Sequence, residues 1–132
     1  PLCPYFYYLC VDLRVAIAII THKQVFVVIR KFEPTIRCIA LTYELRQRWL
    51  IVHQQKELPV LYKGLELPGG FRMDLLVNDR VVIEIKSVEK LMPIHKAQVL
   101  TYLKLSGKKL GLVLNFNSTA VGASVRRVVN DL

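Results

Sequence analysis

The stretch that decides the fold runs from Phe71 to Lys86, FRMDLLVNDRVVIEIK, and sets Asp74, Glu84 and Lys86 among apolar residues. The run Val81–Ile85 predicts a buried strand, where an unpaired carboxylate or ammonium group is costly. Because side chains alternate along a strand, Glu84 and Lys86 share one face and meet side by side. Two carboxylates beside a lysine can hold a divalent metal ion and a water molecule, so these three charges predict a functional site.

The length of the connection before Val81 decides whether the two carboxylates meet. Directly opposed residues of an antiparallel pair share a face of the sheet. A two-residue turn would set Asp74 opposite Ile83 and turn it away from Glu84. A three-residue connection, Asn78–Arg80, sets Asp74 opposite Glu84. We therefore predict that connection, or a bulge that restores the same parity.

Proline, glycine and hydrophobic periodicity predict the other elements. A helix is expected from Pro34 to about Arg48, with an apolar stripe of Ile36, Ile39, Ala40 and Tyr43. A second helix is expected to begin at Pro93 and end at Gly107. Strands are expected near Val52–Glu57, Leu58–Tyr62, Gly70–Val77 and Leu110–Asn115. The β-branched runs Val15–Ile20 and Val25–Ile29 are candidate strands, with a helix left open as the alternative for the first run. The segment Val121–Val129 fits either a helix or a strand.

The arrangement Asp, nine residues, Glu-x-Lys resembles the core motif of the PD-(D/E)XK nuclease superfamily. Its flanks, YKGLELPGGFRMDLLV and VVIEIKSVEKLMPIHKAQVLTYLKLSGKKLGLVLNF, look like the GxxExxY family of small bacterial proteins within that superfamily. The similarity runs from about Tyr43 to the C-terminus. It implies an α/β (α+β), restriction-endonuclease-like core with a central mixed β-sheet flanked by helices. It also implies a nuclease that hydrolyses phosphodiester bonds of nucleic acid, expected to be DNA.

The resemblance assigns roles to the central residues. Asp74, Glu84 and the main-chain carbonyl of Ile85 would bind Mg²⁺ or Mn²⁺, because oxygen ligands suit a hard cation. Lys86 would orient the attacking water or offset negative charge. The alternative is a structural network in which the two acids form ion pairs with Lys86 or Arg72.

The N-terminal part, residues 1–42, departs from the family pattern. Residues 30–37, RKFEPTIR, hold neither glycine nor tyrosine at the spacing of the naming motif. The superfamily's first acidic position could correspond to Glu44, although Arg48 four residues later makes a surface ion pair an equal alternative. Glu33 is a rival for this role, and its favourable place near a helix N-terminus is an adequate explanation. Pro68 also stands where family members commonly carry an aspartate.

Several residues after the strand are candidates for nucleic-acid binding. Gln98 and Tyr102 lie four apart on one helix face and resemble the QxxxY motif of RecB-type exonucleases. His95 is three residues before Gln98, although an exposed place in the first helical turn explains it as well. Phosphate contacts are expected from lysines and arginines around the site, among them Lys90, Arg126 and Arg127, although these side chains could simply be solvated.

Composition limits the classes of protein that fit. A length of 132 residues predicts one domain, residues 1–132, and 53% of the residues are hydrophobic. No transmembrane helix is expected, because His22 and Lys23 interrupt the best candidate, Val15–Ile29, and a bilayer span needs about 20 apolar residues. The N-terminus also lacks the pattern of a secretory signal. Cys3, Cys10 and Cys38 show no CxxC spacing, which argues against zinc and disulfides and favours the cytoplasm.

The formal net charge of +9 favours a polyanionic partner. Two functions compete with a nuclease. A catalytically inactive module of the same fold would bind nucleic acid without cleaving it. An interaction protein, a homodimer that pairs the apolar surface of Cys3–Ile29, would need no nucleic acid at all.

Overall fold

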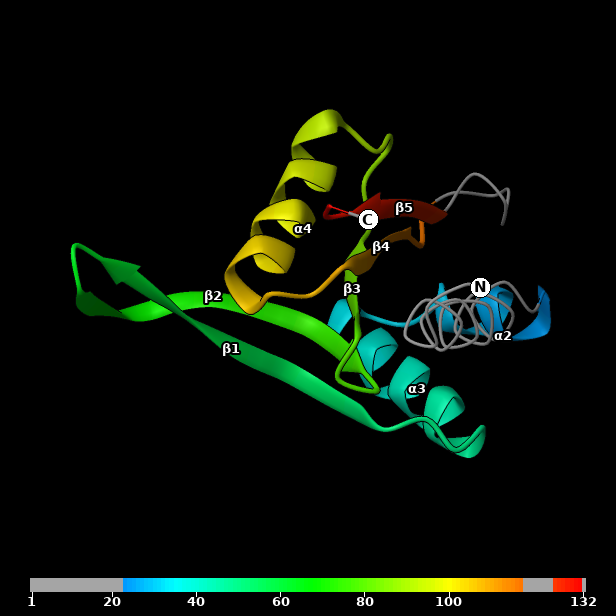
Figure 1. Cartoon of the computed structure of the whole chain (residues 1–132). Coiled ribbons are helices and arrows are strands. Elements are labelled where there is room, and N and C mark those ends of the chain that lie inside the picture. The colour runs from blue at the N-terminus through cyan, green and yellow to red at the C-terminus, as the bar shows by residue number, and fades with distance from the viewer. Residues whose placement is uncertain (1–22, 118–124, 132) are drawn as a thin grey trace, which may run out of the picture.

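The structure, a computed structural model, describes residues 23–117 and 125–131. A five-stranded mixed sheet lies at the centre of this part of the chain (Figure 1). The elements are α2 (Lys23–Ile29), α3 (Pro34–Gln47), β1 (Val52–Tyr62), β2 (Leu65–Val77), β3 (Val81–Lys86), α4 (Pro93–Ser106), β4 (Leu110–Asn115) and β5 (Val125–Val129). The strands lie side by side in chain order, with β3 and β4 parallel and the other pairs antiparallel. This confirms the predicted α/β fold with a mixed sheet and flanking helices.

Helices cover both faces of the sheet and form two cores (Figure 1). On one face α3 buries Leu41 against the sheet, with α2 beside it, and on the other face α4 buries Val99 and Leu103. The inner strand β3 serves both cores, because Ile83 packs on the α3 side and Val82 on the α4 side. Its alternating side chains are therefore all removed from water until the strand reaches its charged C-terminal end.

The ends of the two longer helices follow the predicted signals. Pro34 and Pro93 occupy the first turns of α3 and α4, where the missing N–H group of proline costs no hydrogen bond. Gly107 adopts φ 71° directly after α4, a left-handed conformation that glycine takes without strain. Both helices thus begin and end within a residue of the expected positions.

The expectation of a strand over Val25–Ile29 is wrong, because these residues belong to the helix α2. Phe26 and Ile29 are three positions apart and both are buried in the α3-side core. The Phe26 ring stacks on that of Phe116, with ring centroids 5.1 Å apart. The β-branched content favours a strand locally, but burial of one helical face against the core decides the conformation.

The predicted apolar stripe of α3 is also wrong. Ile36, Ile39 and Tyr43 are exposed by 45%, 50% and 61%. The buried face consists instead of Cys38, Leu41, Thr42 and Leu45. Because α3 carries apolar residues on more than one side, periodicity alone permits two stripes, and the contact with the sheet selects the second.

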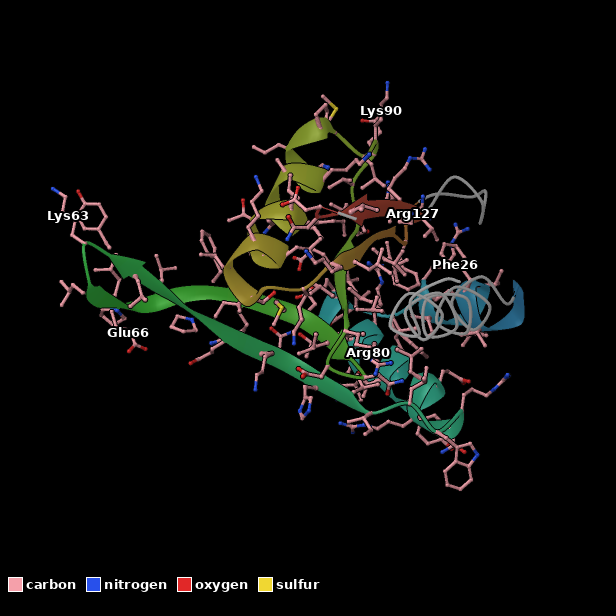
Figure 2. All side chains as sticks on the ribbon, in the orientation of Figure 1. Phe26, Lys63, Glu66, Arg80, Lys90 and Arg127 are labelled. Carbon is pink, nitrogen blue, oxygen red and sulfur yellow. The ribbon has the colours of Figure 1, made fainter. Side chains whose placement is uncertain are left out.

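Strands β1 and β2 form one long hairpin that extends beyond the helices, with Lys63 and Glu66 at its tip (Figure 2). The two strands expected over residues 52–62 are a single strand, and β2 begins at Leu65 instead of near Gly70. The pairing is irregular between Leu58 and Val60. One end of the hairpin therefore pairs with β3, and the other end forms an exposed two-stranded arm.

Two further predictions concern the ends of the chain. The run Val15–Ile20 lies outside the described residues, as do Cys3, Cys10 and the first residues of the segment 121–129. The remainder of that segment forms the strand β5. Among the described residues no helix combines the length and the apolar character that a membrane crossing requires.

Candidate active site

The connection between β2 and β3 has the predicted odd length. Residues 78–80 form the turn, and the register pairs Val77 with Val81 and Leu75 with Ile83. Asn78 and Asp79 adopt φ angles of 50° and 55°, a left-handed conformation that Asn and Asp accept more readily than most side chains. The predicted register is thus confirmed, and its next pair in sequence would be Asp74 and Glu84.

At that next pair the two strands separate and form a fork. The backbone pairing ends at Leu75 and Ile83, and the Ile85 N–H donates to Asp74 Oδ2 over 2.8 Å. If the β2–β3 pairing continued, a backbone carbonyl of β2 would accept the hydrogen bond from the Ile85 N–H. The Asp74 carboxylate accepts it instead. The N–H and C=O groups of a strand residue point to the same edge, so the Ile85 carbonyl also opens into the fork.

The side-chain alternation of β2 reverses at Asp74. Met73 packs on the α4 side, whereas Leu75 packs on the α3 side. The neighbouring residue of β1, Gln55, has φ 50°, and neither it nor Asp74 takes part in the β1–β2 register. Asp74 therefore lies at an irregular point of the hairpin and lines the groove under α3, while the alternation of β3 turns Glu84 toward α4.

Glu84 is a buried carboxylate with an unsatisfied oxygen. It is 5% exposed, and Lys86 Nζ lies 3.5 Å from its Oε1. Among the described residues no hydrogen-bond partner reaches Oε2. Burial, followed by the negative charge of Asp74, raises the pKa of Glu84 to about 7, although the Lys86 ammonium and the Asp74 backbone N–H favour the charged form. The two acids are therefore close enough to repel each other.

This arrangement fits a hard cation. The oxygen donors available at the fork are the carboxylates of Asp74 and Glu84 and the carbonyl of Ile85, and Oε2 of Glu84 lacks a partner. A bound cation would offset both the repulsion between the acids and the burial of their charge. Within residues 23–117 and 125–131, no three His, Cys, Asp or Glu side chains gather into one cluster, so the carbonyl would have to supply the third ligand.

Helix α3 does not bring a carboxylate to the fork. The groove beside Asp74 has a volume of about 350 Å³ and is lined by Pro34, Thr35, Cys38, Ile39, Gln54, Gln55, Arg72, Asp74 and Ile85. Glu44, the candidate for the superfamily's first acidic position, instead lines a separate hollow between α2 and α3, and its role as a metal ligand stays a prediction. Glu44 follows Cys38 by six positions. Six positions correspond to about 9 Å along the helix axis and about 240° around it. Glu33 is exposed at the N-cap position of α3.

On the α3 side of the fork, Cys38 and Gln55 lie beside Asp74, where α3 contributes no carboxylate. The Cys38 thiol lies 3.9 Å from the Asp74 carbonyl oxygen, and Gln55 Nε2 donates to its sulfur over 3.8 Å. Burial raises the pKa of the Cys38 thiol, and the charges of Asp74 and Glu84 act in the same direction. A neutral thiol is thus the form that this position favours.

Helix α4 brings Gln98 and Tyr102 together, as predicted. Gln98 Nε2 donates to the Tyr102 hydroxyl over 2.7 Å. Burial and then the charge of Glu84 raise the pKa of Tyr102, which places the phenol near the buried acid. His95 has a local structural role, because its Nδ1 accepts the Met92 N–H over 2.8 Å at the start of the helix.

The predicted phosphate-binding residues lie around α4 and the far edge of the sheet (Figure 2). Lys90 precedes the first turn of α4, and Arg126 and Arg127 are exposed on the edge strand β5. In strand order β5 is two strands away from β3. These side chains are accessible to a polyanion but do not line the groove beside Asp74.

Sequence reasoning overlooked three residues near the site. Cys38 and Gln55 carried no signal, because they approach Asp74 only through the packing of α3 and the kink of β1. Phe71 contacts Tyr102 with ring centroids 5.6 Å apart. The LPGGF sequence before it, residues 67–71, could have indicated a bulge that redirects this ring.

Comparison with known proteins gives a match to a family model. The family model described as the PD-(D/E)XK nuclease superfamily matches residues 11–128, which includes much of the N-terminal part that departs from the family pattern. No curated protein and no solved structure matches the chain. The narrower assignment to the GxxExxY family, the single-domain organisation and the homodimer stay predictions.

Proposed function

The chain belongs to the PD-(D/E)XK nuclease superfamily, and on this premise we propose that it hydrolyses phosphodiester bonds of nucleic acid, with DNA as substrate and Mg²⁺ or Mn²⁺ as cofactor. The observation that carries the proposal is the buried Glu84 carboxylate, with one oxygen unpartnered among the described residues and with Asp74 beside it at the fork. Such a pair is costly without a cation and is the expected donor set for one.

In the proposed mechanism Asp74, Glu84 and the carbonyl of Ile85 would hold a divalent cation. When bound, the cation would supply positive charge that stabilises the transition state and would lower the pKa of a water molecule. The Lys86 ammonium, 3.5 Å from Glu84 Oε1, orients the attacking water and offsets negative charge on the phosphate. Gln98 and Tyr102 position the strand from the α4 side.

A cleavage assay tests this proposal. Mn²⁺ and Mg²⁺ are titrated against labelled single-stranded DNA, double-stranded DNA and RNA, with Lys86→Ala as the matched control. Lys86 is partly exposed, so its removal should leave the fold intact. We expect the variant to cleave about 10²- to 10³-fold more slowly than the wild-type protein, as for the loss of one preorganised charge-stabilising group.

A second function is favoured by the composition of α3. The helix presents Thr35 and Cys38, not a carboxylate, to the groove beside Asp74. A chain that lacks the first acid could bind nucleic acid through its basic surface without cleaving it. Wild-type cleavage no faster than that of Lys86→Ala, together with salt-dependent binding, would favour this module over the nuclease.

A further inference from the structure

A second hollow lies on the α4 side of the fork, outside the groove under α3. It has a volume of about 300 Å³ and is lined by Phe71, Ile94, Ala97, Gln98, Thr101 and Tyr102. Phe71 is 42% exposed although it is a large aromatic residue. The hollow is therefore an accessible apolar site with one aromatic wall.

The position of Phe71 is fixed by a bulge in the hairpin. Pairing of Leu58 with Phe71 is followed by pairing of Val60 with Leu67, so three residues of β2 oppose the single residue Pro59. Gly69 in this bulge has φ 72°, and a side chain on Gly70 would collide with the Leu58 carbonyl oxygen. Bulges redirect the side chains beside them, and this one directs the Phe71 ring toward α4.

The hollow shares Tyr102 with the proposed active site. One side of the Tyr102 ring contacts Phe71, and its hydroxyl accepts a hydrogen bond from Gln98. Tyr102 belongs to the α4-side core, toward which the alternation of β3 also turns Glu84, and the charge of Glu84 contributes to the raised pKa of the phenol. A group held in the hollow would thus lie on the same side of the sheet as Glu84, against the side chain that the hollow shares with the proposed active site.

The chemistry of the walls selects a planar, partly polar occupant. Phe71, Ile94 and Ala97 offer apolar and aromatic surface, whereas Gln98 and Thr101 add a carboxamide and a hydroxyl group that can pair with polar edges. Unpaired nucleobases stack on aromatic side chains and hydrogen-bond through their edges. A base inside a duplex is stacked on both sides and cannot enter without being flipped out.

We propose that this hollow binds an unpaired nucleobase next to the scissile phosphate, with Phe71 as its stacking platform. The inference rests on the proposed nuclease function and specifies its substrate as single-stranded nucleic acid or a frayed end. The net charge of +9 attracts the backbone of either strand form, and the hollow adds the preference for the unpaired form.

Fluorescence anisotropy in EDTA tests the proposal without cleavage. The probes are a short oligothymidylate, an abasic oligomer of the same length and a blunt duplex. Phe71→Ala should bind the oligothymidylate roughly 5- to 100-fold more weakly than the wild-type protein, as for the loss of one stacked base. Phe71→Trp should retain binding, and duplex binding should not change.

Two controls separate stacking from folding. Phe71→Leu keeps apolar volume but removes the aromatic face, so it should lose affinity in the same way as Phe71→Ala. Tyr62→Ala removes an exposed aromatic ring of the same hairpin, outside the hollow, and should bind as the wild-type protein does. Thermal unfolding of each variant identifies any loss that arises from the fold.

Three results would overturn the proposal: equal binding by Phe71→Leu and the wild-type protein, equal losses on oligothymidylate and duplex, or no wild-type preference for oligothymidylate over the abasic oligomer. Because binding is measured without metal, its outcome is independent of cleavage. A protein that binds as expected but cleaves no faster than Lys86→Ala would refute the nuclease and leave the nucleobase site standing.

Discussion

Replacing Glu84 with glutamine keeps the shape of the side chain and removes its charge. Glu84 is 5% exposed, and its pKa is raised from 4.5 to about 7 by burial and by Asp74. The folded protein thus destabilises the ionised carboxylate. We expect Glu84→Gln to stabilise the metal-free protein at alkaline pH.

The size and sign of the effect follow from proton linkage. A pKa raised from 4.5 to about 7 corresponds to about 3 kcal/mol, at about 1.4 kcal/mol per pH unit. Between these values the folded state binds more protons than the unfolded state, so stability falls as pH rises. The difference between Glu84→Gln and the wild-type protein should be near zero at pH 4.5 and reach about 3 kcal/mol above pH 7. This difference already includes the lost attraction to Lys86, because the Lys86 ammonium lowers the pKa of Glu84 from the value that burial and Asp74 alone would give.

Urea unfolding of both proteins in EDTA, at several pH values from 4.5 to 8, measures this difference. Glu66→Gln is the matched control, because it removes an exposed carboxylate at the hairpin tip and should change stability by less than about 0.5 kcal/mol at every pH. A difference for Glu84→Gln that stays constant with pH would refute the reasoning, since a buried charge must give a pH-dependent term. Mn²⁺ should then stabilise the wild-type protein but not the variant.

The remaining predictions concern the cation, the core and the basic surface. Mn²⁺ affinity should rise up to tenfold per pH unit below about pH 7 and level off above it, because binding displaces the proton of Glu84. Calorimetry in two buffers should detect the released proton. Asp74→Asn should abolish this binding. Gly111→Ala should destabilise the fold by about 1–3 kcal/mol in urea unfolding, because its Cβ would lie 2.5 Å from Val99 Cγ1, and Val99→Ala in the same chain should restore part of the loss. Arg127→Ala should weaken single-strand and duplex binding equally and reduce the slope of log affinity against log salt by about one, whereas an unchanged slope would exclude a phosphate contact.

Much of the fold follows from local signals in the sequence. Pro34, Pro93 and Gly107 fix helix ends because they restrict or free the backbone at single positions, and β3 is recognisable as an apolar run. The parity argument for residues 78–80 also holds, because strand alternation is a local property. The sequence alone thus predicted the hairpin register as far as Leu75 and Ile83, whereas the predicted pairing of Asp74 with Glu84 does not form, because the strands separate there.

Other features depend on contacts between distant segments. Neither the helical state of α2 nor the buried face of α3 could be read from periodicity, since both depend on what packs against the sheet. The alternation of β2 side chains reverses at Asp74 because of an irregularity that Asp74 shares with Gln55 on β1. No sequence pattern predicted this reversal. The place of Glu44 in a separate hollow has the same origin, because the position of this side chain depends on how α3 packs against the sheet.

By itself, the sequence determined the charged trio of Asp74, Glu84 and Lys86, the register of the hairpin up to Leu75 and Ile83, and the basic charge that favours a polyanion. Tertiary structure alone decided that Glu84 is buried with an unpartnered oxygen, that α3 supplies a thiol and not an acid, and that Phe71 forms a wall beside Tyr102. The physical reason is that register and alternation act between neighbours in the chain, whereas burial, pKa and hollow shape are set by elements that meet only in the folded molecule.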